Sequence, residues 1–174
     1  MKKIKKVKIA KDKSVPSTYV PKGLTASDKK KQIKSILKKT DRPKLDSFKS
    51  KRSGWAEKFE KKYGKKITDE KWIDKNILKK KGQKEIIDKG KGAYYSSGSR
   101  PNQTPYSWGY GRLASVVMGG PAKRLDIKIW DKYKHHTLSH LLLMINAQSS
   151  GKSFSEAHKV ALGKVKRKKK VVKK

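Results

Sequence analysis

The sequence predicts a mainly α fold, in which several short helices surround a small core and a basic tail extends from each end. Three observations lead to this prediction. Apolar residues recur at helical spacing behind Ser or Thr residues that suit helix caps. Glycines follow several of these segments, as they do at helix ends. Both ends of the chain are Lys-rich runs that resist burial, so the core must form between them.

Five positions carry helix start signals, each a Ser or Thr: Thr25, Ser53, Thr68, Thr104 and Ser153. Asp28 and Glu156 stand three residues after the first and last of them, as in a capping box. Pro105 takes the first helical position after Thr104. The apolar residues expected on the helix faces are Ile33, Ile36 and Leu37; Trp55, Phe59 and Tyr63; Ile67 and Trp72; and Phe154, Ala157, Val160 and Ala161.

Glycines mark the expected helix ends. Gly64 ends the second helix, Gly82 ends the third, and residues 119–121 (Gly-Gly-Pro) stop the helix that starts at Pro105 and runs to Met118. Residues 125–133 are ambiguous. Alternating apolar residues there favour a short strand, whereas apolar residues four apart favour a helix. This segment is the one place where the sequence predicts a short β element.

The net charge of the chain indicates which classes of partner it can bind. A net charge of +35 over 174 residues makes the folded chain repel itself and attracts it to polyanions such as nucleic acid or anionic lipid headgroups. Runs of like charge are usually solvated and disordered when free. The residues expected to bind polyanions are Lys2, Lys3, Lys5, Lys6, Lys8, Lys164, Lys166, Arg167, Lys168, Lys169 and Lys170.

The predicted organisation has four parts. Residues 1–14 form a basic N-terminal arm, 15–133 a helical domain, 134–163 a helical extension and 164–174 a basic C-terminal tail. The longest apolar run, residues 141–145, is far shorter than the ~20 residues that span a bilayer, so no transmembrane segment is expected. The N-terminus lacks the apolar stretch of a secretory signal.

One long stretch, residues 92–122, contains no Lys, and its only cations are Arg100 and Arg112. We expect a loop over residues 92–105 that leads into the helix after Thr104. The planar guanidinium of Arg stacks on aromatic rings and tolerates desolvation better than Lys does. Two interpretations stay open. The stretch is either tightly packed core, with its Arg residues bound to loop carbonyls, or a docking element that presents Tyr94, Tyr95, Arg100, Trp108 and Arg112 to a partner protein.

Three blocks of sequence carry a resemblance to a known family: VPSTYVPKGLTASDKKKQIKSI (15–36), RPKLDSFKSKRSGWAEKFEKKYG (42–64) and GKGAYYSSGSRPNQTPYSWGYGRLASVVMGGPAKRLD (90–126). Together they resemble an uncharacterised domain family of giant algal and amoebal viruses, with looser relatives in marine phages, over residues 15–133. The resemblance implies a viral origin and supplies no reaction or site. Gly111 stands where the family pattern suggests Ala, which weakens the helix by ~1 kcal/mol and opens room for a close contact.

The sequence does not indicate an enzyme, a cofactor or a small-molecule substrate. Residues 151–153 (Gly-Lys-Ser) resemble the end of a phosphate-binding loop, but Asn146 stands where its first Gly is needed. His136 and His140 have the spacing of two zinc ligands, yet the chain has no Cys and no third ligand nearby, so we predict no metal site. A nuclease or ligase that uses a Tyr nucleophile is a remote alternative, because no partnered base accompanies Tyr94 or Tyr95.

The expected function is therefore structural. The chain is interpreted as a minor capsid or sub-shell protein of a virus particle that docks to other virion proteins and contacts the genome or inner-membrane headgroups through its tails. It would reside in the virion, and in the host cytoplasm or nucleus before assembly. The alternative is a core protein that binds and condenses the genome. An aromatic, Arg-bearing block favours the docking role, since Tyr and Arg are frequent anchors of protein interfaces.

Overall fold

The computed structural model describes residues 5–135 together with residues 145, 151, 153 and 156. The chain divides into two compact units, residues 1–134 and residues 135–174. The predicted mainly α class is confirmed by the described residues. Their elements are β1 (Lys6–Ala10), β2 (Lys13–Pro16), a 3-10 turn η1 (Ser17–Tyr19), α1 (Ala26–Leu37), α2 (Gly54–Tyr63), α3 (Glu70–Asn76), α4 (Lys80–Ser96), α5 (Pro105–Val117), α6 (Pro121–Leu125) and α7 (Ile127–Tyr133).

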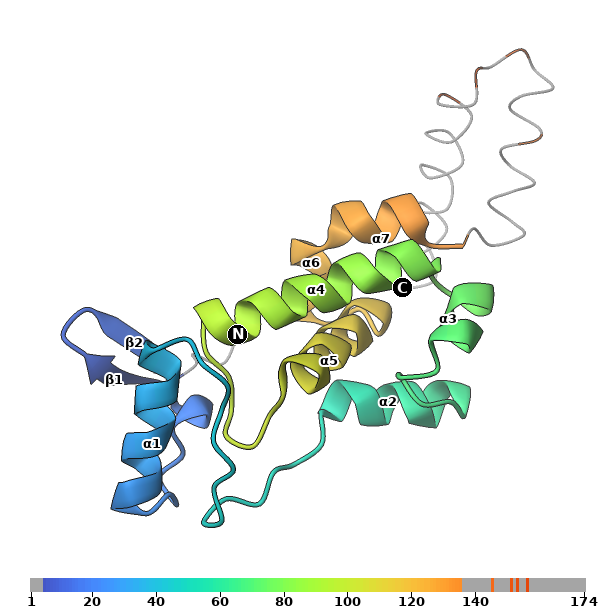
Figure 1. Ribbon diagram of the computed structural model, residues 1–174. Helices are drawn as coiled ribbons and strands as arrows, with labels where there is room; N and C mark the ends of the chain where they lie inside the picture. The colour runs from blue at the N-terminus through green and yellow to red at the C-terminus, as the bar shows by residue number, and fades with distance from the viewer. Residues whose placement is uncertain (1–4, 136–144, 146–150, 152, 154–155, 157–174) are drawn as a thin grey trace, which may run out of the picture. The chain divides into compact units, whose positions relative to one another are not determined.

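The β element lies at the N-terminus, within the predicted basic arm. β1 and β2 form an antiparallel hairpin, with Val7 opposite Val15 (Figure 1). Along β1 the lysines are exposed, while Val7 and Ile9 are half-buried. Most of the basic arm, residues 6–13, is therefore part of this hairpin. The apolar residues between the lysines follow the two-residue period of a strand with one face on the core.

Residues 125–133 are helical, so the strand interpretation of this segment is wrong. α6 ends at Leu125 and α7 follows after the single residue Asp126, whose backbone N–H donates to the Ala122 carbonyl oxygen. Tyr133, on the last turn of α7, is buried, and its hydroxyl donates to Glu85 at 2.9 Å. The four-residue spacing that ends at Tyr133 indicated the correct structure.

Most of the predicted helix starts are confirmed. The Thr25 hydroxyl accepts a hydrogen bond from the Asp28 N–H, and Thr104 forms a complete capping box with Ser107. α2 begins after Ser53 and ends at Gly64, whose φ of 65° is left-handed. α3 is capped by Asp69 instead of Thr68. Ser153 and Glu156 exchange the predicted capping-box hydrogen bonds, while the apolar residues predicted for that helix lie outside the described residues.

Gly82 does not end a helix. α3 ends after Asn76, and Gly82 lies in the first turn of α4, a helix of 17 residues that extends to Ser96. A Cβ on Gly82 would lie 2.6 Å from the Cβ of Tyr133, so this glycine makes room for the Tyr133 ring. The loop predicted for residues 92–105 is consequently shorter, because residues 92–96 complete α4.

The main core forms around the crossing of α4 and α5, which Figure 1 shows between the hairpin with α1 and the pair α2 and α3. A Cβ on Gly90 would lie 2.6 Å from the Cα of Gly109, so only glycine allows these backbones to approach so closely. Trp55 and Trp72, predicted as core residues, are half-buried against this core. Its buried members are Ala56, Phe59, Ile67, Ile73, Leu78, Ile86, Ile87, Leu113, Ala114, Val116, Val117 and Tyr133.

Candidate functional site

The Lys-poor stretch contributes to the core more than to the surface. Tyr94, proposed from the sequence as a docking side chain, is fully buried on the inner face of α4. Its hydroxyl accepts a hydrogen bond from the Arg42 N–H at 2.7 Å and donates to the Gln103 carbonyl oxygen at 3.0 Å. Burial raises the pKa of this phenol. Tyr94 therefore cannot anchor a partner protein, and the core interpretation is correct for it.

The buried arginine that binds backbone carbonyls is Arg42, which sequence reasoning missed. Arg42 is 8% exposed, and its guanidinium donates to the carbonyl oxygens of Ser35 at 3.0 Å and Tyr94 at 2.7 Å. The same group donates to the Ser99 hydroxyl at 3.1 Å and lies 4.6 Å from the centre of the Tyr94 ring. Burial lowers the pKa of Arg42. A single buried cation thus joins α1, the loop after it and the end of α4.

The remaining predicted docking residues have intramolecular partners. Arg112 donates two hydrogen bonds to the buried carboxylate of Asp126, from Nε to Oδ2 at 2.6 Å and from Nη2 to Oδ1 at 3.0 Å. Tyr95 is half-buried and donates to Asp41 at 2.9 Å. The Trp108 ring meets the Tyr19 ring edge to face at 5.6 Å. The ion pair of Arg112 with Asp126 thus attaches the junction of α6 and α7 to α5.

Arg100 differs from Arg112. Its guanidinium lies 5.9 Å from the centre of the Trp108 ring, and no carboxylate pairs with it within residues 5–135. The sequence assigned Arg100 and Trp108 to the same docking element, and the structure places them near each other. Arg100 is the one predicted docking cation that, among the described residues, stays available to an external anion.

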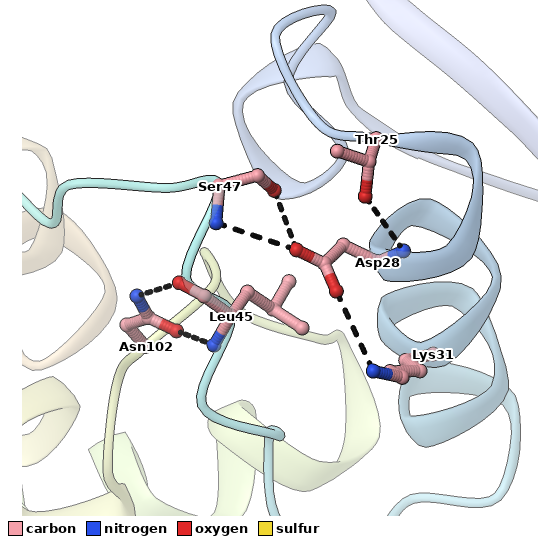
Figure 2. Close-up of polar contacts among 6 residues, drawn as sticks. All are labelled: Thr25, Asp28, Lys31, Leu45, Ser47 and Asn102. Carbon is pink, nitrogen blue, oxygen red and sulfur yellow. Dashed lines mark hydrogen bonds and ion pairs between the residues drawn. The ribbon is translucent and has the colours of Figure 1, made fainter.

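The segment between α1 and α2 is held in place by side chains on both sides (Figure 2). On one side, Asp28 of α1 accepts a hydrogen bond from the Ser47 hydroxyl at 2.6 Å, and this bond is the main cause that lowers the pKa of Asp28. On the other side, Asn102 accepts from the Leu45 N–H at 2.7 Å and donates to the carbonyl oxygens of Leu45 at 2.9 Å and Phe48 at 2.7 Å. We call these hydrogen bonds the clamp; they hold residues 45–48, and residues 49–53 follow directly after them.

Asn102 can form this clamp because of its own backbone. Its φ of 55° is left-handed, a conformation that Asn adopts more readily than most residues. Nearby, the buried Gln32 amide of α1 donates to the carbonyl oxygens of Tyr19 at 3.0 Å and Ser99 at 3.1 Å. These bonds tie η1 and the loop before α5 to the same helix. Three chain segments that are distant in sequence thus meet around residues 48–53.

Where these segments meet, they enclose three adjoining hollows that share lining residues and together form what we call the basic groove. The first, about 420 Å³, is lined by Lys5, Ser17, Thr18, Pro21, Lys22, Phe48, Lys49, Lys51, Arg100 and Gln103. The second, about 460 Å³, is lined by Ser50, Lys51, Arg52, Ser53, Ala56, Ile67, Thr68, Asn102, Gln103, Thr104, Ser107, Tyr110 and Gly111. The third, about 240 Å³, is lined by Ser53, Arg100, Gln103, Ser107, Trp108, Gly111, Arg112 and Ala122.

The basic groove is lined by cations, and no carboxylate lies among its lining residues in the described part of the chain. Two of its cations are already paired, Arg52 with Glu60 and Arg112 with Asp126. The five that line the first hollow form no ion pair within residues 5–135; they are Lys5, Lys22, Lys49, Lys51 and Arg100. Five cations around one concavity repel one another, and a bound anion relieves that repulsion.

Of the lysines predicted to bind polyanions, Lys5 lies in the basic groove, and Lys6 and Lys8 are exposed on β1. The others lie outside the described residues. Sequence reasoning did not single out Lys22, Lys49, Lys51 or Phe48 as site residues. The available signal was the stretch SFKSKRS at residues 47–53, which alternates hydroxyl and cationic residues without an acid.

The sequence profile of a family of unknown function (DUF5824) matches residues 16–132. The chain belongs to this family. The match spans nearly the range 15–133 in which the sequence resembles an uncharacterised domain family. No curated protein and no solved structure matches the chain. Apart from Lys5, every residue that lines the basic groove lies within the DUF5824 match.

Membrane-spanning helices and metal centres are both absent from the part of the chain that the structure describes. No helix there is long and apolar enough to cross a membrane. No three His, Asp or Glu side chains gather there as they do around a metal ion. His136 and His140, and most of the segment that resembles a phosphate-binding loop, lie outside the described residues.

Proposed function

We propose that this chain is a nucleic-acid-binding structural protein, and that the virus particle implied by the sequence resemblance is where it acts. The observation that carries this proposal is the first hollow of the basic groove, where five cations, unpaired within residues 5–135, converge with no carboxylate in the lining. Phosphate groups are the ligands that such a lining recognises best, since Lys and Arg dominate contacts to nucleic-acid backbones.

The shape of the site favours nucleic acid over lipid headgroups. A membrane is a broad surface, which a flat or convex basic face contacts best. Here the cations line a concavity, and hydroxyl and amide groups lie among them, including Ser17, Thr18 and Gln103. Neutral donors of this kind supplement Lys and Arg in contacts to phosphate and sugar oxygens. The Lys-rich ends of the chain would add nonspecific affinity of the same sign.

Docking to other particle proteins is the second candidate, and a different surface favours it. Leu125 is 72% exposed and Ile127 is 42% exposed on α6 and α7. Ile127, Lys123 and Arg124 line a hollow of about 580 Å³. An apolar patch with flanking cations suits a protein segment that carries an apolar anchor and acidic neighbours.

Substituting Leu125 with Glu should abolish such docking without lowering the melting temperature. Normal assembly of that variant into particles would remove this candidate.

The nucleic-acid proposal is tested by the salt dependence of binding in the full chain. A Lys49→Gln/Lys51→Gln variant should flatten the log–log slope for a single-stranded oligonucleotide by about 0.7 for each phosphate that a substituted lysine neutralises in the parent chain. The matched control is Lys29→Gln/Lys30→Gln on α1, where both lysines are exposed and line no part of the groove. An equal change of the salt slope in the two variants would mean that the oligonucleotide binds diffusely over the basic surface. Absence of binding by the parent chain would refute the proposed function itself.

A further inference from the structure

Every hollow of the basic groove is lined by one aromatic residue. Phe48 lines the first, Tyr110 the second and Trp108 the third. Each hollow also contains at least two cations, and the hollows adjoin through shared residues such as Gln103. Cations for the backbone and rings for the bases are the two components of grooves that bind single strands. We infer that the basic groove binds single-stranded nucleic acid in preference to a duplex, an inference that rests on the proposed function.

The concave form of the site supports a single strand. A duplex keeps its bases stacked inside and offers only phosphates and groove edges to a protein. It could contact the lysines at the rim of the groove, but its bases could not reach Phe48 or Trp108. The unstacked bases of a single strand can occupy hollows of this size and lie against their rings. Only a single strand can therefore contact both the cations and the aromatic rings of the groove.

The rings are held in defined places. Tyr110 donates its hydroxyl hydrogen to Glu70 at 2.6 Å, which raises its pKa to about 12 and keeps it neutral. The Trp108 ring lies 5.6 Å from the Tyr19 ring and 5.9 Å from the Arg100 guanidinium. Phe48 lies at the end of the clamp, which holds its backbone, since Asn102 donates to its carbonyl oxygen at 2.7 Å. Preorganised rings bind bases without first losing conformational freedom.

Simple electrostatics predicts the opposite preference. A duplex carries charge more densely than a single strand, and its binding releases more counterions per contact. A protein that binds only through scattered lysines therefore favours the duplex. A preference for single strands thus requires contacts beyond charge, and the groove supplies them in its three rings.

The test compares one oligonucleotide, free and annealed to its complement, by fluorescence anisotropy on the full chain. Salt is raised until binding through charge alone becomes weak. We expect tighter binding of the single strand, and we expect Phe48→Leu to reduce that affinity by about fivefold or more without changing duplex affinity. Trp108→Leu is the second ring variant, and the melting temperature of each variant shows whether it is folded. The Lys29→Gln/Lys30→Gln variant serves as the control and should keep the preference.

The possible outcomes separate the inference from the function on which it rests. Equal or tighter binding of the duplex, with no effect of a folded ring variant, would overturn the single-strand inference and leave a charge-based nucleic-acid function intact. Absence of binding to either form would overturn both. A single-strand preference that Phe48→Leu weakens in the folded protein would support both.

Discussion

The crossing of α4 and α5 and the clamp on residues 45–48 hold the molecule together in different ways. At the crossing, Gly90 and Gly109 bring two backbones together, and apolar side chains fill the surroundings. At the clamp, Asp28 and Asn102 bind an irregular segment through hydrogen bonds to its backbone and hydroxyl groups. The first region depends on the absence of a side chain at two glycines, whereas the second depends on particular polar atoms. The basic groove is built on the second.

The largest expected effect comes from substituting Arg42, which, like the clamp, holds chain segments together through hydrogen bonds. Arg42→Met should lower the free energy of unfolding by roughly 3 kcal/mol or more, because several buried acceptors lose a charged donor at once. Arg52→Met is the matched control: Arg52 forms an exposed pair with Glu60, and its loss should cost less than about 1 kcal/mol. Urea denaturation measures both. Equal effects would mean that the Arg42 network contributes no more than a surface ion pair.

The next effect tests the crossing. Gly109→Ala should destabilise the fold by roughly 1–3 kcal/mol, since its Cβ would lie 2.8 Å from the Ile87 carbonyl oxygen and the helices would have to separate. Two residues further along the same helix, Gly111→Ala should instead stabilise the fold by up to about 1 kcal/mol, because only Ser53 lies near, at 3.7 Å. Thermal unfolding measures both. The same sign for the two substitutions would contradict the close crossing.

Asn102 tests the clamp itself. Asn102→Gly keeps the left-handed backbone but removes three hydrogen bonds, and should cost roughly 1–2 kcal/mol. Asn102→Ala should cost about 1 kcal/mol more, because Ala strains at this φ. The Gly variant should also bind a single strand several-fold more weakly, since Phe48 and Lys49 lose their fixed position. Affinity of the folded Gly variant equal to that of the parent would mean that the clamp does not support the groove.

The smallest effect is the pH dependence from Asp28. Its pKa is lowered in the folded chain, chiefly by the Ser47 hydroxyl. A carboxyl whose pKa is lower when folded stabilises the fold above its unfolded pKa of about 4, and this contribution is lost as the pH falls through the lower folded value. The difference in melting temperature between the parent and Asp28→Asn should therefore shrink as the pH drops below about 4. Ser47→Ala should reduce the same difference at neutral pH, and a difference independent of pH would exclude this role for Asp28.

Glycine shows how far the sequence could predict the fold. Gly64 was expected to end a helix and does so with a left-handed backbone, which is a local property. Gly82 was also expected to end a helix, but it lies inside α4. A glycine is needed there because the ring of Tyr133, 51 positions away, occupies the space that a side chain would fill. Local sequence cannot reveal such a distant partner. The hairpin was missed for a simpler reason: its turn, Lys11-Asp12, lacks the Asn-Gly or Asp-Gly pair that usually marks two-residue turns.

The candidate site was predictable only in part. Sequence reasoning found Arg100 and Trp108 because Lys is absent around them. It also included Tyr94, since a buried Tyr that hydrogen-bonds the backbone and an exposed Tyr that contacts a partner have the same local sequence. The residues that line the groove come from four separate parts of the chain, within residues 5–22, 48–56, 67–68 and 100–122, which meet only in the folded chain. Charge composition predicted an anionic partner but could not show where the cations converge.

The central claim is that the basic groove, and not the basic surface in general, receives the anion. Lysine acetylation of the full chain with and without a bound single-stranded oligonucleotide, read by mass spectrometry, tests it most directly. We expect the oligonucleotide to protect Lys22, Lys49 and Lys51 strongly, while Lys29 and Lys30, also exposed on α1, keep their reactivity. Uniform protection of all five lysines, or protection confined to the chain ends, would contradict the claim.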